Sequence, residues 1–304
     1  MGSVRWAFRC GSWTPTRPDW LFAARCVQRE EKDRIGQFVF ARDAKSAMAG
    51  RLLLRKFVHD RIGIPWSEIT LERSPRGKPY LATPMKVGPD SLPETPSWSF
   101  NLSHQGDYAV LAAEQGMQVG VDIMKITMPG SSSVPEFFRI MTRQFTAYEW
   151  SVIQSSSLEH QQLAAFYRHW ALKESFIKAI GTGLGFNLQR VEFQVSPEPL
   201  SQTGALRQTK MLLDEEEEDN WVFEESLLDA DHHVAVALGP ADNAGSSALL
   251  PPPPPPPPTS FTLLSFSDLI ASASPLTEED PACWDSFKMK AEAPQRQREA
   301  RASE

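Results

Sequence analysis

Residues 159–180, EHQQLAAFYRHWALKESFIKAI, form the most regular stretch of the chain, and the rest is interpreted outward from them. Their apolar residues recur at helical spacing, which predicts one long amphipathic helix. Gly181 follows directly and is the residue type that closes a helix in the left-handed conformation. The recurring apolar residues are Leu163, Phe166, Trp170, Phe176 or Ile177, and Ile180.

Shorter patterns on both sides of this helix predict a mixed α/β fold. Residues 35–59 carry apolar side chains at helical spacing with Arg and Lys between them, which favours one or two helices. Alternating or continuous apolar runs predict strands, two of which are joined by a Gln-Gly-Asp turn at residues 105–107. The expected strands are residues 97–102, 108–113, 119–123, 191–195, 221–224 and 233–238. We expect an α/β (α+β) protein with two halves, residues 1–115 and 116–240.

A separate organisation is expected after residue 240. Pro251–Pro258 is an unbroken proline run, typical of a stiff polyproline II spacer, and it lies within a linker of residues 241–260. Residues 261–288 are apolar enough that we expect them to dock on the folded body. Residues 289–304 are polar and are expected to be disordered. The acidic run Asp214–Asp219 is interpreted as an exposed hairpin tip.

Composition and charge exclude several classes of protein. The formal charge is −7, yet the first 120 residues hold 17 basic and 12 acidic side chains, which favours an anionic ligand or partner for that part. The basic residues are scattered and match no nucleic-acid-binding motif. No apolar run approaches the roughly 20 residues of a membrane helix.

The three cysteines fit neither a disulfide framework nor a zinc site, which favours a reducing compartment such as the cytosol. No acidic residue precedes Asp19, so a weak organelle-targeting signal is left open as an alternative location.

Two acidic positions are candidates for chemistry. Glu174 and Lys178 are one helical turn apart, and they are either a surface ion pair or a partly buried ligand-binding pair. Asp122 interrupts the apolar run 119–124 and is either a strand-end cap or a metal ligand. Together Asp122 and Glu174 would suit Mg²⁺, which takes oxygen ligands, and Gly120 would let the backbone approach a ligand closely.

Two further segments could bind an anion. Residues 73–78 place three cations around a proline and a glycine, which is either a phosphate-binding loop or a solvated basic turn. His104 ends a predicted strand and is either a ligand to an anion or a packed core histidine.

These motifs occur together in the order and approximate spacing of one family. The chain resembles the 4′-phosphopantetheinyl transferases of the surfactin-synthetase type, and particularly their animal members, over residues 4–240. The resemblance rests on four separated motifs: Gly77-Lys-Pro79, Phe100-Asn-Leu-Ser-His104, Val119-Gly-Val-Asp122 and Trp170-Ala-Leu-Lys-Glu-Ser-Phe-Ile-Lys178.

The resemblance implies transfer of the phosphopantetheine arm of coenzyme A to a carrier-protein serine, with release of adenosine 3′,5′-bisphosphate. It implies Mg²⁺ bound by Asp122 and Glu174, charge neutralisation by Lys178, and Glu174 as the base. Arg34, Arg73, Lys78 and His104 would hold the 3′-phosphate and adjacent groups. The whole implied coenzyme site is Arg34, Arg73, Ser74, Pro75, Arg76, Gly77, Lys78, Asn101, Leu102, Ser103, His104, Asp122, Glu174 and Lys178.

One position departs from the family pattern. Many members have a second acidic residue two positions after the motif Asp, where this chain has Met124. Thioether sulfur is a poor Mg²⁺ ligand, so we expect a water in its place, held by Gln105.

The resemblance further implies a monomeric, cytosolic pseudodimer of two similar α/β halves with coenzyme A in the crevice between them. The implied acceptors are apo acyl carrier proteins and carrier domains: those of fatty acid synthase, the mitochondrial carrier and aminoadipate-semialdehyde dehydrogenase. Two alternatives of other classes are a Mg²⁺-dependent phosphohydrolase that uses Asp122 and Glu174, and an adaptor that uses its proline run.

Overall fold

The structure, a computed structural model, describes residues 2–83, 97–181, 185–241 and 254–294. Contacts divide the chain into two compact units. Unit 1 comprises Met1–Arg5, Pro93–Gly106 and Leu111–Thr262, and unit 2 comprises Trp6–Leu92, Asp107–Val110 and Leu263–Glu304. The expected boundaries at residues 115/116 and 240/241 stay predictions, and Pro251–Pro253 lie outside the described residues.

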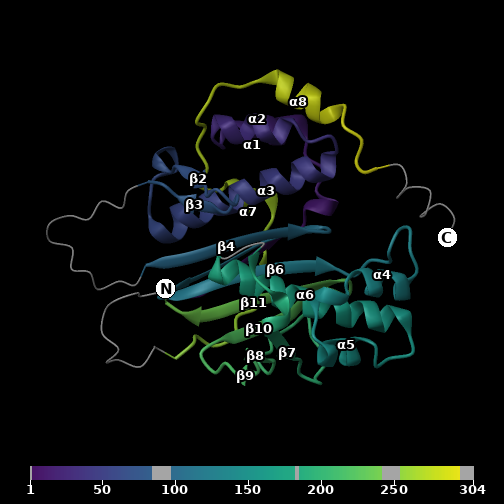
Figure 1. Ribbon diagram of the computed structural model, residues 1–304. Coiled ribbons are helices and arrows are strands. Elements are labelled where there is room, and N and C mark those ends of the chain that lie inside the picture. Colours follow the sequence, from purple (N-terminus) through teal and green to yellow (C-terminus); the bar gives the residue numbers. More distant parts are fainter. Residues whose placement is uncertain (1, 84–96, 182–184, 242–253, 295–304) are drawn as a thin grey trace, which may run out of the picture. The chain divides into compact units, whose positions relative to one another are not determined.

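The described residues form helices and several sheets, so the expected mixed α/β class is confirmed (Figure 1). The helices are α1 Arg17–Arg25, α2 Arg29–Gly36, α3 Ala41–Phe57, α4 Val134–Ile140, α5 Ala147–Ile153, α6 Glu159–Ile180, α7 Phe266–Ile270 and α8 Pro281–Lys288. The strands are β1 Val4–Phe8, β2 Leu71–Arg73, β3 Pro79–Leu81, β4 Trp98–Gln105, β5 Tyr108–Gln115, β6 Met117–Lys125, β7 Val191–Gln194, β8 Lys210–Leu213, β9 Glu216–Glu217, β10 Val222–Asp229, β11 His232–Pro240 and β12 Thr262–Leu263. The sheet orders are β12-β1-β5-β4, β10-β11-β6, β2-β3 and β7-β8-β9.

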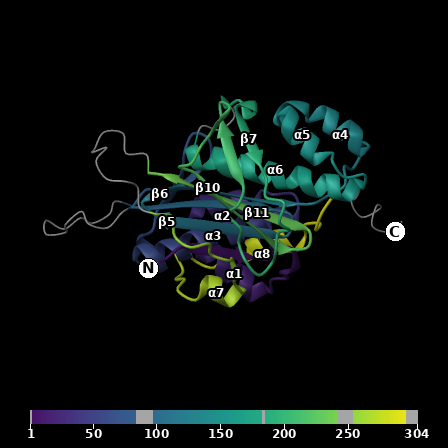
Figure 2. The ribbon, with the colours of Figure 1, turned by 90° about the horizontal axis from the view of Figure 1, so that it is seen from below.

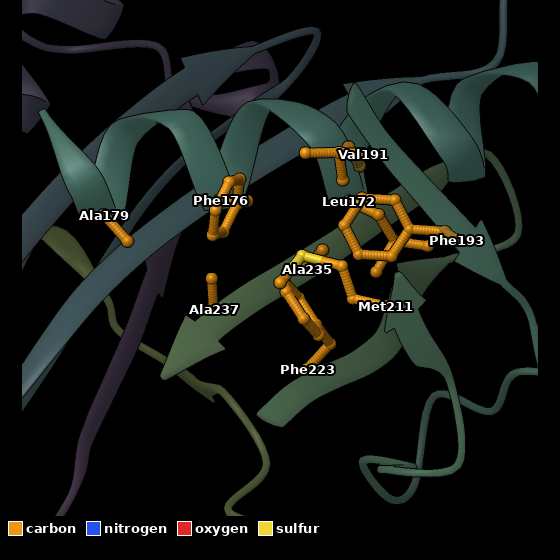
Figure 3. Packing of buried hydrophobic residues seen from close by; sticks show 10 residues of the cluster. Leu172, Phe176, Ala179, Val191, Phe193, Met211, Phe223, Ala235 and Ala237 are labelled. Carbon is orange, nitrogen blue, oxygen red and sulfur yellow. The ribbon is translucent and has the colours of Figure 1, made fainter. Parts of the chain in front are cut away.

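Helix α6 is the central helix of unit 1, and its bounds and left-handed Gly181 cap are as predicted. It packs on β6 and β11, while α4 and α5 lie beside its first half (Figure 2). Side chains of α6 and of the strands interdigitate beneath it (Figure 3). Each large apolar side chain buried in this way stabilises the fold by about 1.5–3 kcal/mol. The buried cluster is Ala171, Leu172, Phe176, Ala179, Val191, Phe193, Met211, Phe223, Ala235 and Ala237.

Gly120 explains how closely α6 approaches the sheet. A Cβ at this position would overlap the backbone carbonyl oxygen of Ser175 and lie 2.5 Å from the backbone nitrogen of Ala179. The glycine therefore admits the helix backbone. This corrects the expectation that Gly120 makes room for a ligand.

Strands β4 and β6 in unit 1 are linked by side-chain hydrogen bonds. Three alternate side chains of β4 accept the backbone N–H groups of three alternate residues of β6. The pairs are Asn101 Oδ1 with Val121 (2.9 Å), Ser103 Oγ with Ile123 (3.3 Å) and Gln105 Oε1 with Lys125 (2.6 Å). The period-2 geometry of a strand places these three side chains on one face.

Unit 2 contains α1, α2 and α3, the β2–β3 hairpin and the described end of the chain. Thr16 and Asp19 form a capping box at the start of α1, a signature that the sequence analysis did not use. Trp20 of α1 stacks on Phe287 of α8 with ring centroids 4.0 Å apart, and Leu269 of α7 is fully buried.

Residues near the end of the described chain also supply hydrogen-bond acceptors to the first turn of α3. Phe40, the N-cap of α3, provides no side-chain cap. Instead the carbonyls of Ala291 and Glu292 accept the N–H groups of Ala41 (2.9 Å) and Arg42 (3.2 Å). These contacts supply acceptors for helix N–H groups that have no intrahelical partner.

Among the described residues, no helix is long and apolar enough to span a bilayer. The acidic run 214–219 lies at an exposed turn, with Asp214 and Glu215 at positive φ between β8 and β9, as expected.

Candidate functional site

Asp122 lies in the middle of β6, opposite Ala235 of β11, and only 8% of its surface is exposed. Its Oδ1 accepts a hydrogen bond from Ser103 Oγ (3.4 Å). Its Oδ2 is buried without a hydrogen-bond partner among the described residues. The strand-end cap is therefore wrong, and Asp122 is a buried carboxylate with one unused oxygen.

The charges of Glu174 and Lys178 act on Asp122. Burial raises the pKa of Asp122 to about 8; the positive charge of Lys178 opposes this rise and the negative charge of Glu174 adds to it. Burial likewise raises the pKa of Glu174, again against the attraction of Lys178. Glu174 is half-buried, and Lys178 Nζ donates to the Leu102 carbonyl (3.0 Å). The pair is therefore more than an exposed surface ion pair.

This arrangement fits a divalent cation. Glu174 raises the proton affinity of Asp122, which also keeps an unsatisfied oxygen, and a cation between two such carboxylates would stabilise their charged forms. Mg²⁺ commonly uses only one or two protein carboxylates and completes its coordination with water and phosphate oxygens. Among the described residues, no three or more His, Cys, Asp and Glu side chains are clustered as a metal site.

The motif strand β4 contacts its neighbours through both side chains and backbone. Asn101 and Ser103 are buried, and their side chains bind β6 as described above. Leu102 presents its carbonyl to Lys178. His104 is exposed, so the packed-core alternative for this histidine is wrong.

Met124 packs with two apolar clusters of unit 1, those around Phe176 and Phe166. Its side chain thus has a core role at the position where many relatives have an acid. Gln105 Oε1 is engaged by Lys125, so the water that Gln105 is expected to hold stays a prediction.

The basic candidates of unit 2 lie on and around the β2–β3 hairpin. Gly77 has a φ of +85°, which only glycine adopts easily, and its N–H donates to the Ser74 carbonyl (2.8 Å). Lys78 donates its N–H to Ser74 Oγ (3.1 Å). Pro75 and Arg76 are exposed at the tip. Residues 74–78 therefore form a tight, hydrogen-bonded turn with exposed cations.

Arg73 distinguishes this hairpin from a merely solvated basic turn. Its Nε and Nη2 donate to Glu31 Oε1 and Oε2, both at 3.3 Å, and its Nη1 donates to the Gly77 carbonyl (3.2 Å). Arg34, from α2, lies near the same carboxylate, with Nη1 3.7 Å from Glu31 Oε2. The structure thus brings Arg34 and Arg73 together through Glu31.

The predicted residues belong to two units, and each set is described by itself. Residues 101–104, Asp122, Glu174 and Lys178 belong to unit 1, whereas Arg34 and residues 73–78 belong to unit 2. Within each unit, residues far apart in sequence converge.

Several charged residues of the two units were not predicted from the sequence. Glu31 and Arg51 carried no motif that would have singled them out. Lys173 is fully buried and bonds Glu149 Oε1 (2.6 Å) and the carbonyls of Gln144 and Leu188 (both 2.9 Å). Glu149 could have been found, because Thr146 and Glu149 form a capping-box signature.

Comparisons with known proteins show the family to which the chain is similar. Residues 11–116 match the family model "4′-phosphopantetheinyl transferase, N-terminal", and residues 118–237 match that of the 4′-phosphopantetheinyl transferase superfamily. The L-aminoadipate-semialdehyde dehydrogenase-phosphopantetheinyl transferase of Xenopus laevis is 57% identical over 99% of this chain and 97% of its own length. The human protein of the same name is 54% identical over 97% and 94%.

A more distant relative extends the similarity to bacteria. A 4′-phosphopantetheinyl transferase of Bacillus pumilus is 31% identical over 56% of this chain and 64% of its own length. Neither the phosphohydrolase nor the adaptor finds support in these comparisons. The matches cover both halves of the folded chain and every motif on which the resemblance rested, so the chain belongs to the 4′-phosphopantetheinyl transferase superfamily and is a transferase enzyme.

Proposed function

We propose that this transferase moves the 4′-phosphopantetheine arm of coenzyme A to a serine of apo carrier proteins and releases adenosine 3′,5′-bisphosphate. The observation that carries the proposal is the buried Asp122 carboxylate, with its unused oxygen, beside Glu174 and Lys178. These three residues occupy the family motifs.

Asp122 and Glu174 would hold Mg²⁺, which would supply positive charge to the pyrophosphate of coenzyme A. Lys178 adds a fixed cation from the same helix as Glu174. Transfer of a phosphoryl-type group depends mainly on positioning and charge neutralisation, which this set of residues can provide.

The attacking serine must lose a proton, and Glu174 is the proposed base, directly or through a water. Its raised pKa supports this role, because a general base works best when its pKa lies near the operating pH. Glu174 is also half-buried rather than sealed, which leaves access for a hydroxyl group.

Arg34, Arg73, Lys78 and His104 are proposed to bind the 3′-phosphate and adjacent groups. The exposed turn 74–78 and the backbone of residues 101–104 are proposed to line the nucleotide pocket. Guanidinium groups suit this task because their planar donors match phosphate oxygens.

The proposed acceptors are carrier proteins that are acidic around their serine. The excess of basic residues in the first 120 positions supports such partners through charge complementarity. The name of the relatives makes the carrier domain of aminoadipate-semialdehyde dehydrogenase the first acceptor to test. This acceptor would place the enzyme in lysine catabolism. Fatty acid synthase and the mitochondrial carrier are proposed as further acceptors.

We place the enzyme in the cytosol as a monomer. Cys10 and Cys26 are free and buried and Cys283 is free and half-buried, which suits a reducing compartment. Light scattering after size-exclusion chromatography tests the monomer.

Mass spectrometry of an apo carrier protein tests the proposed reaction. After incubation with coenzyme A and Mg²⁺, we expect the carrier to gain the mass of phosphopantetheine and adenosine 3′,5′-bisphosphate to appear in equal amount. Consumption of coenzyme A without a mass gain on the carrier would support a phosphohydrolase instead.

A further inference from the structure

One buried carboxylate in unit 2 is shared by three arginines. Glu31 lies in the first turn of α2 and is 7% exposed. It contacts Arg34 of α2, Arg51 of α3 and Arg73 of β2. The cluster of three guanidinium groups and one carboxylate has a formal charge of +2.

Arg51 is the member whose hydrogen-bonding capacity is least used. Its Nε lies 3.0 Å from Glu31 Oε2, and its side chain is 4% exposed. Its Nη1 and Nη2 are buried without a hydrogen-bond partner in the described parts of the chain. Burial lowers the pKa of Arg51 to about 10, opposed by Glu31 and assisted by Arg73 and Arg34. A buried cation with unused donors, beside two more cations, indicates a place prepared for an anion.

Among the described residues, Glu31 is the only carboxylate seen to bond Arg73. It fixes that side chain with two hydrogen bonds. An arginine held in this way loses less conformational entropy when it binds phosphate than a free one. Arg51 offsets the negative charge that Glu31 brings to the cluster.

From this geometry we infer that Glu31 is a positioning residue for 3′-phosphate recognition: it orients Arg34 and Arg73, and Arg51 compensates its charge. The inference rests on the proposed function, in which Arg34 and Arg73 bind that phosphate.

Two substitutions of Glu31 separate positioning from simple electrostatics. For each substitution, the two roles predict different changes in phosphate affinity. Glu31→Gln removes a negative charge but retains one acceptor oxygen, so an electrostatic role alone predicts tighter phosphate binding. Glu31→Asp keeps the charge but shortens the side chain, so an electrostatic role alone predicts no change. Positioning predicts weaker binding for both.

Calorimetric titration of the full chain with adenosine 3′,5′-bisphosphate and with adenosine 5′-monophosphate measures the contribution of the 3′-phosphate. We expect each variant to lose roughly tenfold affinity for the bisphosphate, the equivalent of one charge-assisted hydrogen bond, and little for the monophosphate. Glu30→Gln is the matched control, because Glu30 is the exposed neighbour on α2 and its removal changes the charge equally. Thermal unfolding verifies that each variant is folded.

If the wild-type chain prefers the bisphosphate and both Glu31 variants keep that preference, the inference is wrong while the proposed function stands. If the wild-type chain does not prefer the bisphosphate, the assignment of Arg34 and Arg73 fails, and the inference fails with it. Should one variant not fold, the other decides, since positioning requires both to weaken bisphosphate binding. Arg51→Lys, which keeps the charge without the planar fork, is expected to retain more of the preference than either Glu31 variant.

Discussion

The two candidate sites are opposite in charge and alike in construction. In unit 1, Asp122 keeps a buried carboxylate oxygen without a partner, whereas in unit 2, Arg51 keeps two buried guanidinium nitrogens without one, among the residues described. Buried polar groups are normally satisfied, and each exception needs an explanation. The charge of Asp122 suits a cation and that of Arg51 suits an anion. The following predictions test each side of this comparison.

The largest effect is expected on the acidic side. Asp122→Ala and Glu174→Ala should each lower transfer by about 100-fold or more, because each removes charge stabilisation of the reacting phosphates. Glu174→Gln should also be severely impaired, since an amide is neither a base nor an anionic ligand. Carrier modification is measured by mass spectrometry, with Glu159→Ala, at the exposed start of the same helix, as the control. Near-normal transfer by either alanine variant would contradict the proposal that Asp122 and Glu174 bind Mg²⁺.

The pH dependence of the free energy of unfolding should reveal how much the buried, charged Asp122 destabilises the fold. Its pKa is about 8 in the folded protein, whereas an exposed aspartate has an ordinary pKa of 3.8, so between these values the folded state binds more protons than the unfolded state. The free energy of unfolding of the metal-free protein should therefore fall as pH rises through this window, by up to about 1.4 kcal/mol per pH unit. Urea unfolding at several pH values measures the slope. Asp122→Asn should flatten it, and an unchanged slope would contradict the burial argument.

Two lysines five residues apart on α6 should separate stability from chemistry. Lys173→Met leaves Glu149 buried without its ion-pair partner and should cost about 3–5 kcal/mol of unfolding free energy. Lys178→Met removes the hydrogen bond to the Leu102 carbonyl, worth about 1 kcal/mol, and should destabilise the fold less than Lys173→Met while it impairs transfer. Urea unfolding and the transfer assay, run on both variants, measure the contrast. Equal stability losses would show that Lys178 is also structural.

On the basic side, Arg73→Ala and His104→Ala should each weaken coenzyme A more than its dephospho form. Each charge-assisted hydrogen bond to the 3′-phosphate contributes roughly 1.5–3 kcal/mol, which should appear as a higher KM for coenzyme A. Arg29→Ala, an exposed arginine of α2, controls for the change in net charge. Equal losses with both substrates would mean that these residues do not contact that phosphate.

The smallest effect concerns the end of the chain. Because Leu269 and Phe287 are buried and the carbonyls of Ala291 and Glu292 bond α3, residues 261–292 should resist limited proteolysis, while cuts fall at residues 241–260. Mass spectrometry of the fragments identifies the sites. Rapid cleavage throughout residues 261–284 would show that this segment does not pack on the folded body in solution.

Local patterns were predictable from the sequence, and convergence of distant residues was not. The α6 pattern is long and periodic, so its bounds and its Gly181 cap were predicted correctly. The acidic motif residues were found because a carboxylate inside an apolar run is conspicuous. Glu31 and Arg51 look like ordinary helical surface residues, and only the packing of α2, α3 and β2 makes them neighbours.

The side-chain links between β4 and β6 were equally hidden. Asn101 and Ser103 were noticed as motif residues, but a family motif does not say whether a side chain binds a ligand or an adjacent strand. In the structure, both side chains accept hydrogen bonds from backbone N–H groups of β6. The similarity of the two halves as a pseudodimer stays a prediction.

The acceptors that Ala291 and Glu292 provide at the start of α3 bear on the order of synthesis. Roughly 250 residues separate these partners, and the loop that joins them closes only at an entropic cost. On the ribosome, the first residues of unit 2 emerge long before the segment that stacks on Trp20 and completes α3. We expect the nascent protein to carry this apolar surface uncovered until residues 266–292 have left the ribosome, a period in which chaperones can bind it. Helices α1 and α3 are thus made early and completed late.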